Sequence, residues 1–338
     1  MVTTGEPVPI AEGVPTYGAV SQVPGFAVSP NGLLVYASGT SERSRLVWKD
    51  RKGNTLGNLG EPQATPIDSV DLSPDGKRIA FVMFNPRADI WIYDAARGIP
   101  ARFTFDPKDD HTPVWSPDGS LIYFSSNRNG ALNIYRKAAN GARAEELVLA
   151  DSQDKSSGSL SPDGKLLMYS RSAERTAFDL WTISTKKASG DAQRGPGPFL
   201  QSPSTEWRGR LSPDGAWLAY EADDSGEFEV YIASFPGCEG KKQISVSGGL
   251  CARWRSDGKE LFYITPTGEL MAVEVAARNG TLEVGRVEKL FDGVTTLRTL
   301  GATYDVSADG HKFLVVEGGT SSSGPLMLLQ NWVAMLRK

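Results

Sequence analysis

The stretch that decides the fold is Ser116-Pro117-Asp118-Gly119, which stands between the apolar runs Val114-Trp115 and Leu121–Phe124. Proline presets φ at the first central position of a turn, aspartate tolerates the next position, and glycine adopts backbone geometry that other residues resist. A turn of this kind between two short apolar runs predicts a β-hairpin.

The same hairpin signal recurs along the chain, which holds seven copies. Their glycines are 44, 43, 45, 51, 43 and 52 residues apart, so the period is about 45 residues. Self-similarity at such a period indicates a repeat architecture. The other six copies, the last two of them degenerate, begin at Ser29, Ser73, Ser161, Ser212, Arg255 and Ser307.

Two further strands follow each hairpin. A third apolar stretch such as Asp89-Ile90-Trp91 comes about ten residues later, and a more polar one such as Lys241–Val246 ends the unit. Four antiparallel strands per repeat are typical of a propeller blade. We therefore predict an all-β fold, a single-domain, seven-bladed β-propeller of four-stranded antiparallel blades over residues 1–338. The expected blades are residues 21–59, 66–105, 111–149, 156–200, 207–246, 250–292, and 302–332 with 5–12.

The two ends of the chain predict how the ring closes. The seventh repeat supplies a hairpin and a third strand near Leu326–Gln330, and then lacks a fourth strand. The N-terminal stretch Gly5–Val14 has no hairpin before it and aligns with Gly285–Val294, the fourth strand of the sixth repeat. We expect this N-terminal strand to join the last blade and cover an otherwise exposed edge.

Composition excludes several classes of protein. The chain has 338 residues, with 36 Lys and Arg against 40 Asp and Glu, a net charge of −4. This charge provides no basic surface for nucleic acid. No apolar run approaches the roughly 20 residues that span a bilayer, so membrane insertion is not expected. The start lacks the basic and apolar regions of a signal peptide. We expect a soluble monomer.

The two cysteines and two histidines are too few for a disulfide framework or a histidine-rich metal site. Cys238 and Cys251 stand at opposite ends of one expected strand, roughly 20 Å apart. That separation is beyond disulfide reach, so both are predicted to be free thiols.

The hairpins with their Asp-Ile-Trp strands resemble the WD40-like (PD40) repeats of TolB-type propellers. Longer phrases, among them LVWKDRKGNTLGNLGEP and ARFTFDPKDDHTPVWSPDG, resemble the C-terminal sensor-like propeller of acidobacterial serine/threonine protein kinases. The resemblance runs from about Gly5 to Trp332. It implies a sensor-like binding domain without its kinase, on the extracytoplasmic side of the membrane.

Two enzyme classes lack their motifs. The sequence has no glycine-rich phosphate loop, His-Arg-Asp catalytic loop or Asp-Phe-Gly motif of a kinase. It also has no Gly-x-Ser-x-Gly pentapeptide, which prolyl-oligopeptidase-type enzymes carry in an α/β domain beside a similar propeller. Neither a kinase nor a serine hydrolase is expected.

The first strand of each blade lines the central channel. Two residues before each turn stand Ala27, Asp71, Val114, Ser159, Arg210, Arg253 and Asp305. Arg210 and Arg253, with Arg208 nearby, make one basic side, and Asp71 and Asp305 make an acidic side across the ring. One interpretation is ion pairing across the channel. The other is an anion site, because guanidinium groups suit carboxylate or phosphate.

Two more residues are candidates for contact with a ligand or partner at the channel mouth. Trp207 is out of register with the repeated aromatics, and it stands between Glu206 and Arg208. Exposed tryptophans of this kind are frequent at protein interfaces. We predict a ligand site of Arg208, Arg210, Arg253, Asp71, Asp305, Trp207 and Glu206, open to a protein or a small anionic ligand.

The loop that enters the third blade is the candidate metal site. Asp106, Asp109, Asp110 and His111 could bind Ca²⁺ or another divalent ion, as carboxylate and imidazole groups do. The alternative is a solvated acidic loop whose aspartates cap turns. No cofactor is otherwise expected. We favour a non-catalytic binding module; the alternative is a metal-dependent, promiscuous hydrolase of esters, lactones or phosphoesters at the channel.

Overall fold

In the computed structural model, antiparallel strands follow the repeated turns as the sequence predicts. The structure describes residues 16–17, 23–24, 26–37, 43–85, 87–174, 176–186, 195–278, 280–294, 300–318, 326–330 and 332. The predicted strand at residues 5–12 lies outside the described residues.

Five sheets each consist of four consecutive strands, and each begins within one residue of an expected blade. We name each sheet by its first strand. The β7 sheet has β7 (Ile67–Leu72), β8 (Arg78–Phe84), β9 (Ala88–Asp94) and β10 (Pro100–Arg102). The β11 sheet has β11 (Asp110–Trp115), β12 (Leu121–Asn129), β13 (Ala131–Ala138) and β14 (Glu146–Leu149). The β15 sheet has β15 (Lys155–Leu160), β16 (Leu166–Ser172), β17 (Phe178–Ser184) and β18 (Gly197–Leu200). The β19 sheet has β19 (Glu206–Leu211), β20 (Trp217–Ala222), β21 (Glu229–Ser234) and β22 (Lys242–Gln243). The β23 sheet has β23 (Leu250–Trp254), β24 (Glu260–Ile264), β25 (Leu270–Arg278) and β26 (Thr281–Phe291).

A sixth four-stranded sheet, the closing sheet, joins the two ends of the chain. Its order is β27 (Tyr304–Val306), β28 (Lys312–Glu317), β5 (Ser44–Asp50) and β6 (Thr55–Gln63). Lys312 pairs with Asp50 in the register of β28 and β5. Across this pairing, Glu317 forms ion pairs with Arg45 at 2.9 Å and Lys49 at 2.8 Å.

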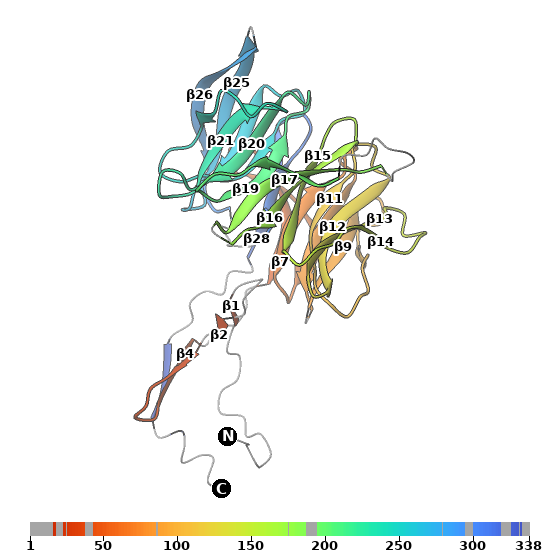
Figure 1. The fold of residues 1–338 in the computed structure, drawn as a ribbon. Helices are drawn as coiled ribbons and strands as arrows, with labels where there is room; N and C mark the ends of the chain where they lie inside the picture. The colour runs from red at the N-terminus through yellow and green to blue at the C-terminus, as the bar shows by residue number, and fades with distance from the viewer. Residues whose placement is uncertain are drawn as a thin grey trace.

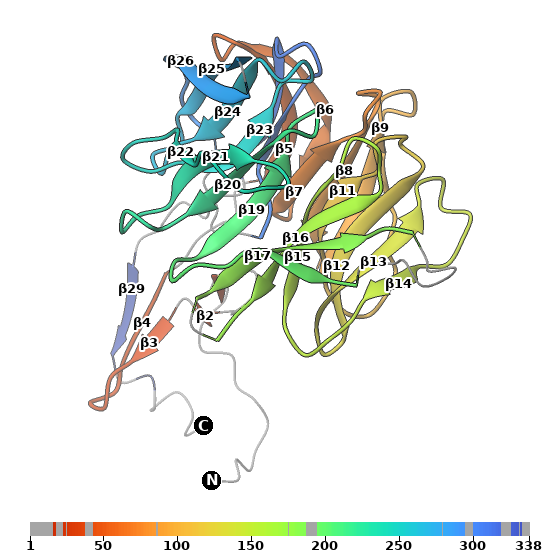
Figure 2. The same cartoon turned by 45° about the horizontal axis from the view of Figure 1, so that its top comes forward.

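The first strands of the six sheets contact one another in a closed cycle. β7, β11, β15, β19, β23 and β27 follow in this order, and β27 returns to β7. Figures 1 and 2 show the sheets arranged around this centre. The all-β propeller of four-stranded antiparallel blades is thus confirmed, and the two chain ends do close the ring. In the closing sheet, β5 and β6 hold the third and fourth positions, and residues 326–330 pair with β4 instead of β28.

The hairpin of the first repeat, at the Ser29 turn, lies outside the cycle of six sheets. It forms the outlying sheet, in the order β29 (Leu326–Gln330), β4 (Leu33–Ala37) and β3 (Phe26–Val28). In Figures 1 and 2 this sheet lies below the ring. A two-stranded pair, β1 (Thr16–Tyr17) and β2 (Val23–Pro24), accompanies it. The sequence could not reveal this, because it does not say which third strand joins which hairpin.

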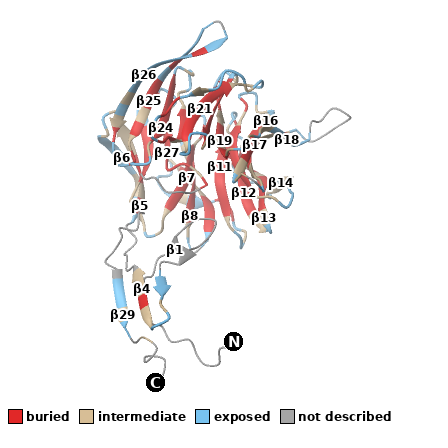
Figure 3. Cartoon of the chain, turned by 60° about the vertical axis from the view of Figure 1, so that its left-hand side comes forward, coloured by how far each residue is buried: buried red, intermediate tan, exposed pale blue. Residues whose placement is uncertain are grey.

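The core lies between neighbouring sheets, as Figure 3 shows by the buried residues along the ring strands. One cluster joins Phe81 of β8 and Leu46 of β5 to Leu314 and Val316 of β28, so it fills the junction where the ring closes. Similar clusters fill the other junctions. Both cysteines are free, as predicted.

Leu46→Ala tests whether strand β5 is an integral part of the ring. The side chain is 2% exposed in the junction cluster, so its truncation should cost about 2–4 kcal/mol of unfolding free energy. Leu56→Ala, on the adjacent strand and 51% exposed, is the matched control and should change stability by less than about 0.5 kcal/mol. Equal denaturation midpoints for the two variants would contradict the packing of β5 in the ring.

Candidate functional site: the channel and the groove at the ring junction

A repeated β-bulge shapes the wall of the channel. The register shifts at the same place in β7, β11, β19 and β23. The residue four positions before the turn has a positive φ in each: 50° at Ser69, 48° at Thr112, 49° at Arg208 and 59° at Cys251. A bulge redirects a side chain and bends the strand. Three of these residues, Ser69, Thr112 and Arg208, line one small cavity in the channel.

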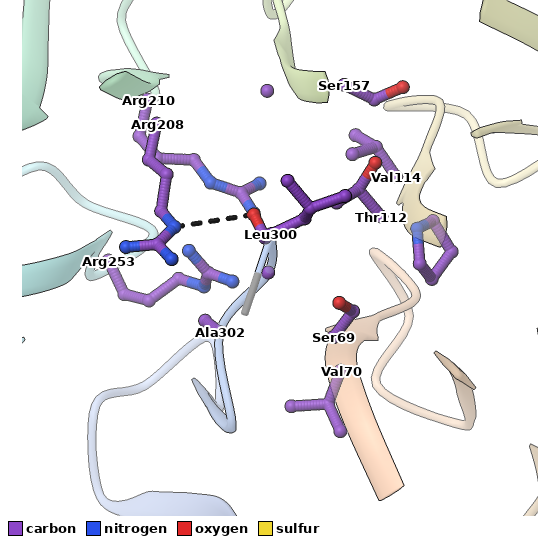
Figure 4. Close-up of a pocket in the computed structure, with 13 residues that line it drawn as sticks. Ser69, Val70, Thr112, Val114, Ser157, Arg208, Arg210, Arg253, Leu300 and Ala302 are labelled. Atoms are coloured by element: carbon purple, nitrogen blue, oxygen red, sulfur yellow. Dashed lines mark hydrogen bonds between the residues drawn. The ribbon is translucent and has the colours of Figure 1, made fainter. Parts of the chain in front are cut away.

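This cavity has a volume of about 20 Å³, which is room for about one water molecule. Arg208, Arg210 and Arg253 converge on it from one side, and Leu300 reaches in from the segment that precedes β27 (Figure 4). The Leu300 carbonyl accepts a hydrogen bond from Arg208 Nε at 3.3 Å. The centre of the channel is therefore filled by side chains.

Each of the three arginines is paired with a carboxylate. Arg210 Nη1 lies 3.5 Å from Asp71 Oδ1, and Arg208 Nη1 donates to Glu221 Oε2 at 2.8 Å. Arg253 Nε lies 3.2 Å from Asp305 Oδ1 as an ion pair without hydrogen-bond alignment. Of the two interpretations offered by the sequence, these contacts support ion pairing. Asp71 and Asp305 come from the neighbouring strands β7 and β27, and Arg210 and Arg253 come from the neighbouring strands β19 and β23; of the pairs, Arg210–Asp71 is the one that crosses the ring.

Burial changes the acid–base behaviour of this network. It raises the pKa of Asp71 to about 6, although Arg210 beside it acts in the opposite direction. Burial also lowers the pKa of Arg210 to about 10, and the neighbouring Arg253 adds to that shift. Both groups still carry their charge at neutral pH, so the pair holds together there.

The channel acids also bind the next blade. Asp305 Oδ2 accepts the backbone N–H of Leu72 at 2.7 Å, and Asp71 Oδ2 accepts that of Trp115 at 2.9 Å. Ser159 Oγ, at the same position of its repeat, accepts the N–H of Leu211 at 2.9 Å. These side chains therefore connect the first strands of neighbouring blades by hydrogen bonds. The sequence analysis missed this role, although the shared position before the turn was a signal that could have revealed it.

Removing one partner of a buried ion pair should be costlier than removing both. Arg210→Leu leaves the Asp71 carboxylate unpaired and should destabilise the protein by about 3 kcal/mol. The double variant Arg210→Leu with Asp71→Asn should recover part of this loss, because no buried charge then remains unpaired. Lys165→Leu, which removes one partner of the exposed pair with Asp163, is the control. Unfolding in denaturant measures these losses. If the loss in the double variant equals the sum of the losses in Arg210→Leu and Asp71→Asn alone, the coupling is contradicted.

Trp207 and Glu206 take no part in the ion pairs of the channel. Trp207 stacks on Phe178, with ring centroids 5.2 Å apart and planes at 4°. The Arg208 guanidinium lies 3.9 Å from the Trp207 ring centroid. Glu206 is buried and accepts a hydrogen bond from Ser202 Oγ. The structure therefore brings Arg208, Arg210, Arg253, Asp71 and Asp305 together and places the Trp207 ring between the Arg208 guanidinium and Phe178, while Glu206 bonds to Ser202.

Glu206 should make stability depend on pH. Burial raises its pKa to about 7, so the carboxyl stays protonated in the folded state while it ionises in the unfolded chain. The unfolded state then binds fewer protons, and stability falls between about pH 4.5 and pH 7. Glu206→Gln should raise the unfolding free energy at pH 8 by about 2 kcal/mol and change it little at pH 4.5.

Exposed Glu227→Gln is the control for this measurement. A stability difference between Glu206→Gln and the parent that is the same at pH 4.5 and pH 8 would contradict the buried, protonated carboxyl.

The three aspartates predicted as metal ligands are bound to protein groups instead, whereas His111 Nδ1 is buried without a hydrogen bond to the described residues. Arg128 pairs with Asp110 at 3.0 Å and lies 3.7 Å from Asp106. Asp109 accepts the backbone N–H of Ala88. His111 is buried against Phe84, and burial lowers its pKa to about 4. Within the described ranges, no group of three or more His, Cys, Asp or Glu side chains is placed to hold a metal ion.

A groove of about 760 Å³ opens at the junction of the closing sheet with the β7 sheet. Apolar side chains from five strands line it: Trp48, Leu56, Leu59, Leu72, Trp254 and Val306. The turns at Ser73–Gly76 and Ser307–Asp309 form its rim, together with Lys312. The sequence analysis missed this groove, since it exists only where residues from the two ends of the chain meet.

Comparisons with known proteins agree with the fold. The family model described as the TolB beta propeller domain (PD40) matches residues 27–194. In structure, the chain is similar to a putative TolB from Agrobacterium tumefaciens, with a TM-score of 0.65 and 18% identity over 82% of this chain and 99% of that one. It is also similar to TolB from Acinetobacter baumannii, with a TM-score of 0.56 and 19% identity over 86% and 66%. At such identities these likenesses concern the fold alone.

The curated relatives match over short segments. An uncharacterized protein, Atu1656, of Agrobacterium fabrum is 34% identical over 77 residues, which are 22% of this chain and 26% of that protein. The uncharacterized peptidase YuxL of Bacillus subtilis is 36% identical over 84 residues, 22% of this chain and 13% of that protein. The chain thus spans about a quarter or less of these relatives. No helix in the described part of the chain is long and apolar enough to cross a membrane.

Proposed function

Because this chain belongs to the TolB-type, PD40 β-propellers, we propose that it is a non-catalytic binding module whose groove at the ring junction receives a segment of a protein partner. The observation that carries the proposal is the groove itself. Its volume of about 760 Å³ lies in the range of ligand-binding clefts, and two tryptophans and four aliphatic side chains line it.

The rim of the groove supports a partner segment with a basic group. Ser73 donates to Asp75 and Ser307 donates to Asp309, each at 2.6 Å, and these bonds hold the pKa of both carboxyls below the usual range. Two permanent negative charges thus stand beside an aromatic and aliphatic floor. Such a surface suits a lysine or arginine next to an apolar side chain.

The channel, by contrast, supports neither an anion site nor catalysis as a first proposal. Its three arginines are neutralised by three carboxylates, and its cavity has room for about one water molecule. A small anionic ligand and a metal-dependent hydrolase therefore rank below the protein partner. The sensor-like role and the extracytoplasmic location remain part of this proposal and rest on the resemblance to kinase-linked propellers.

Selection of peptides on the immobilised protein tests the groove. We expect a random peptide library to yield sequences that combine a basic with an apolar residue. Their affinity, measured by calorimetry, should fall at least tenfold in Leu56→Asp, which places a charge on the groove floor. Leu147→Asp, an equally exposed leucine in the β11 sheet outside the groove, is the matched control. Peptides that bind the parent and Leu56→Asp with the same affinity would contradict the proposal.

A further inference from the structure

The closing sheet and the outlying sheet together use the strands of the first and the last repeat, but in exchanged partnership. β27 and β28 are the hairpin of the last repeat, and they pair with β5 and β6 of the first repeat. β3 and β4 are the hairpin of the first repeat, and they pair with β29 of the last. In the five other sheets each hairpin pairs with the strand that follows it.

Four residues define the exchange. Leu33 and Lys312 are equivalent, because the backbone N–H of each donates to the hydroxyl of the first residue of its turn, Ser29 or Ser307. Lys312 pairs with Asp50, and Leu33 pairs with Gln330. Asp50 and Gln330 therefore hold the same position in a third strand. Each can serve either hairpin without a change of register.

We propose that the chain exchanges these third strands, so that β4 pairs with β5 and β28 pairs with β29. Leu33 then stands opposite Asp50, and Lys312 opposite Gln330. The first repeat becomes a complete four-stranded blade, and the ring has seven blades, with β3 between β27 and β7. The number of strand pairings is the same in the two arrangements, so neither one sacrifices a ladder of backbone hydrogen bonds.

The lengths of the connections permit the exchange. Six residues separate β4 from β5, and eight separate β28 from β29. The equivalent connections within the β15, β19 and β23 sheets are five, six and five residues long. Short connections of this kind join antiparallel neighbours elsewhere in the same ring.

Apolar exposure on the outlying sheet favours its insertion. Phe26 and Val28 are each 49% exposed, Met327 is 40% and Leu328 is 54% exposed. Val28 precedes its turn by one residue, and the six equivalent residues are buried or half-buried between blades: Leu72, Trp115, Leu160, Leu211, Trp254 and Val306. A blade normally buries both faces against its neighbours, and removing apolar surface from water is favourable.

The place of insertion is the junction that carries the groove. Two hydrogen bonds close this junction at the channel, from the Leu72 N–H to Asp305 and from the Val70 N–H to the Ala302 carbonyl. Both must break when β3 enters between β27 and β7. Leu72–Gly76 and Val306–Asp309 form facing walls of the groove, so insertion separates them. A partner held in the groove would therefore favour the six-bladed ring; this consequence alone rests on the proposed function.

Disulfide trapping in the full-length chain tests the exchange, in a Cys238→Ser background that leaves only the buried Cys251. Lys312→Cys with Asp50→Cys reports the six-bladed ring, because paired Cα atoms in antiparallel strands lie within disulfide reach. Leu33→Cys with Asp50→Cys reports the exchanged ring. Leu33→Cys with Lys312→Cys is the matched control, since these two residues pair in neither arrangement.

We expect intramolecular cross-links in the first two variants at least tenfold faster than in the control. Electron microscopy of the trapped proteins should show six and seven blades respectively. Circular dichroism checks that each reduced variant is folded. A Leu33–Asp50 cross-link no faster than the control would overturn the exchange. So would a Lys312–Asp50 cross-link no faster than the control, which would indicate a permanent seven-bladed ring. Cross-linked dimers in place of monomers would also contradict an exchange within one chain.

Discussion

The first strands of this propeller are held together by acceptors that one strand offers to the next, and the rest of the ring depends on them. The side chains of Asp71, Ser159 and Asp305 accept backbone N–H groups of the following blade. Two tryptophans form hydrogen bonds in the opposite direction. Trp115 and Trp254 donate their indole N–H to backbone carbonyls of the preceding first strand, each at 3.0 Å. The first strands of different blades do not form a ladder of backbone hydrogen bonds with one another. These side-chain hydrogen bonds connect them instead.

The same requirement explains why the channel is polar and why its charged groups are paired with one another. An acceptor that faces the channel is itself buried, and a buried carboxylate needs a positive partner. Arg210 and Arg253 meet this need for Asp71 and Asp305. The bulges that redirect Ser69, Thr112 and Arg208 then complete a filled centre. The groove at the ring junction is the surface that we propose for a partner.

Closure imposes a second constraint, because a ring must join strands that are far apart in the sequence. Here the join is made by the pairing of β28 with β5 and is reinforced by Glu317 between Arg45 and Lys49. Seven equivalent hairpins with interchangeable third strands leave more than one way to make that join. The groove and the outlying sheet both result from the pairing of β28 with β5 in this structure.

The sequence by itself determined the elements: the turns, the strands on either side of them, the propeller and the five middle blades. It could do so because a Ser-Pro-Asp-Gly turn and an alternating apolar strand depend on neighbours a few residues away. It also identified Asp71, Arg210, Arg253 and Asp305 as channel residues from their constant place before the turn. Tertiary structure alone decided that these four charges pair, that Trp207 stacks on Phe178, and that Asp106, Asp109, Asp110 and His111 do not converge on an ion. It also decided which third strand joins which hairpin, because equivalent repeats have the same local preferences and only packing between sheets distinguishes them.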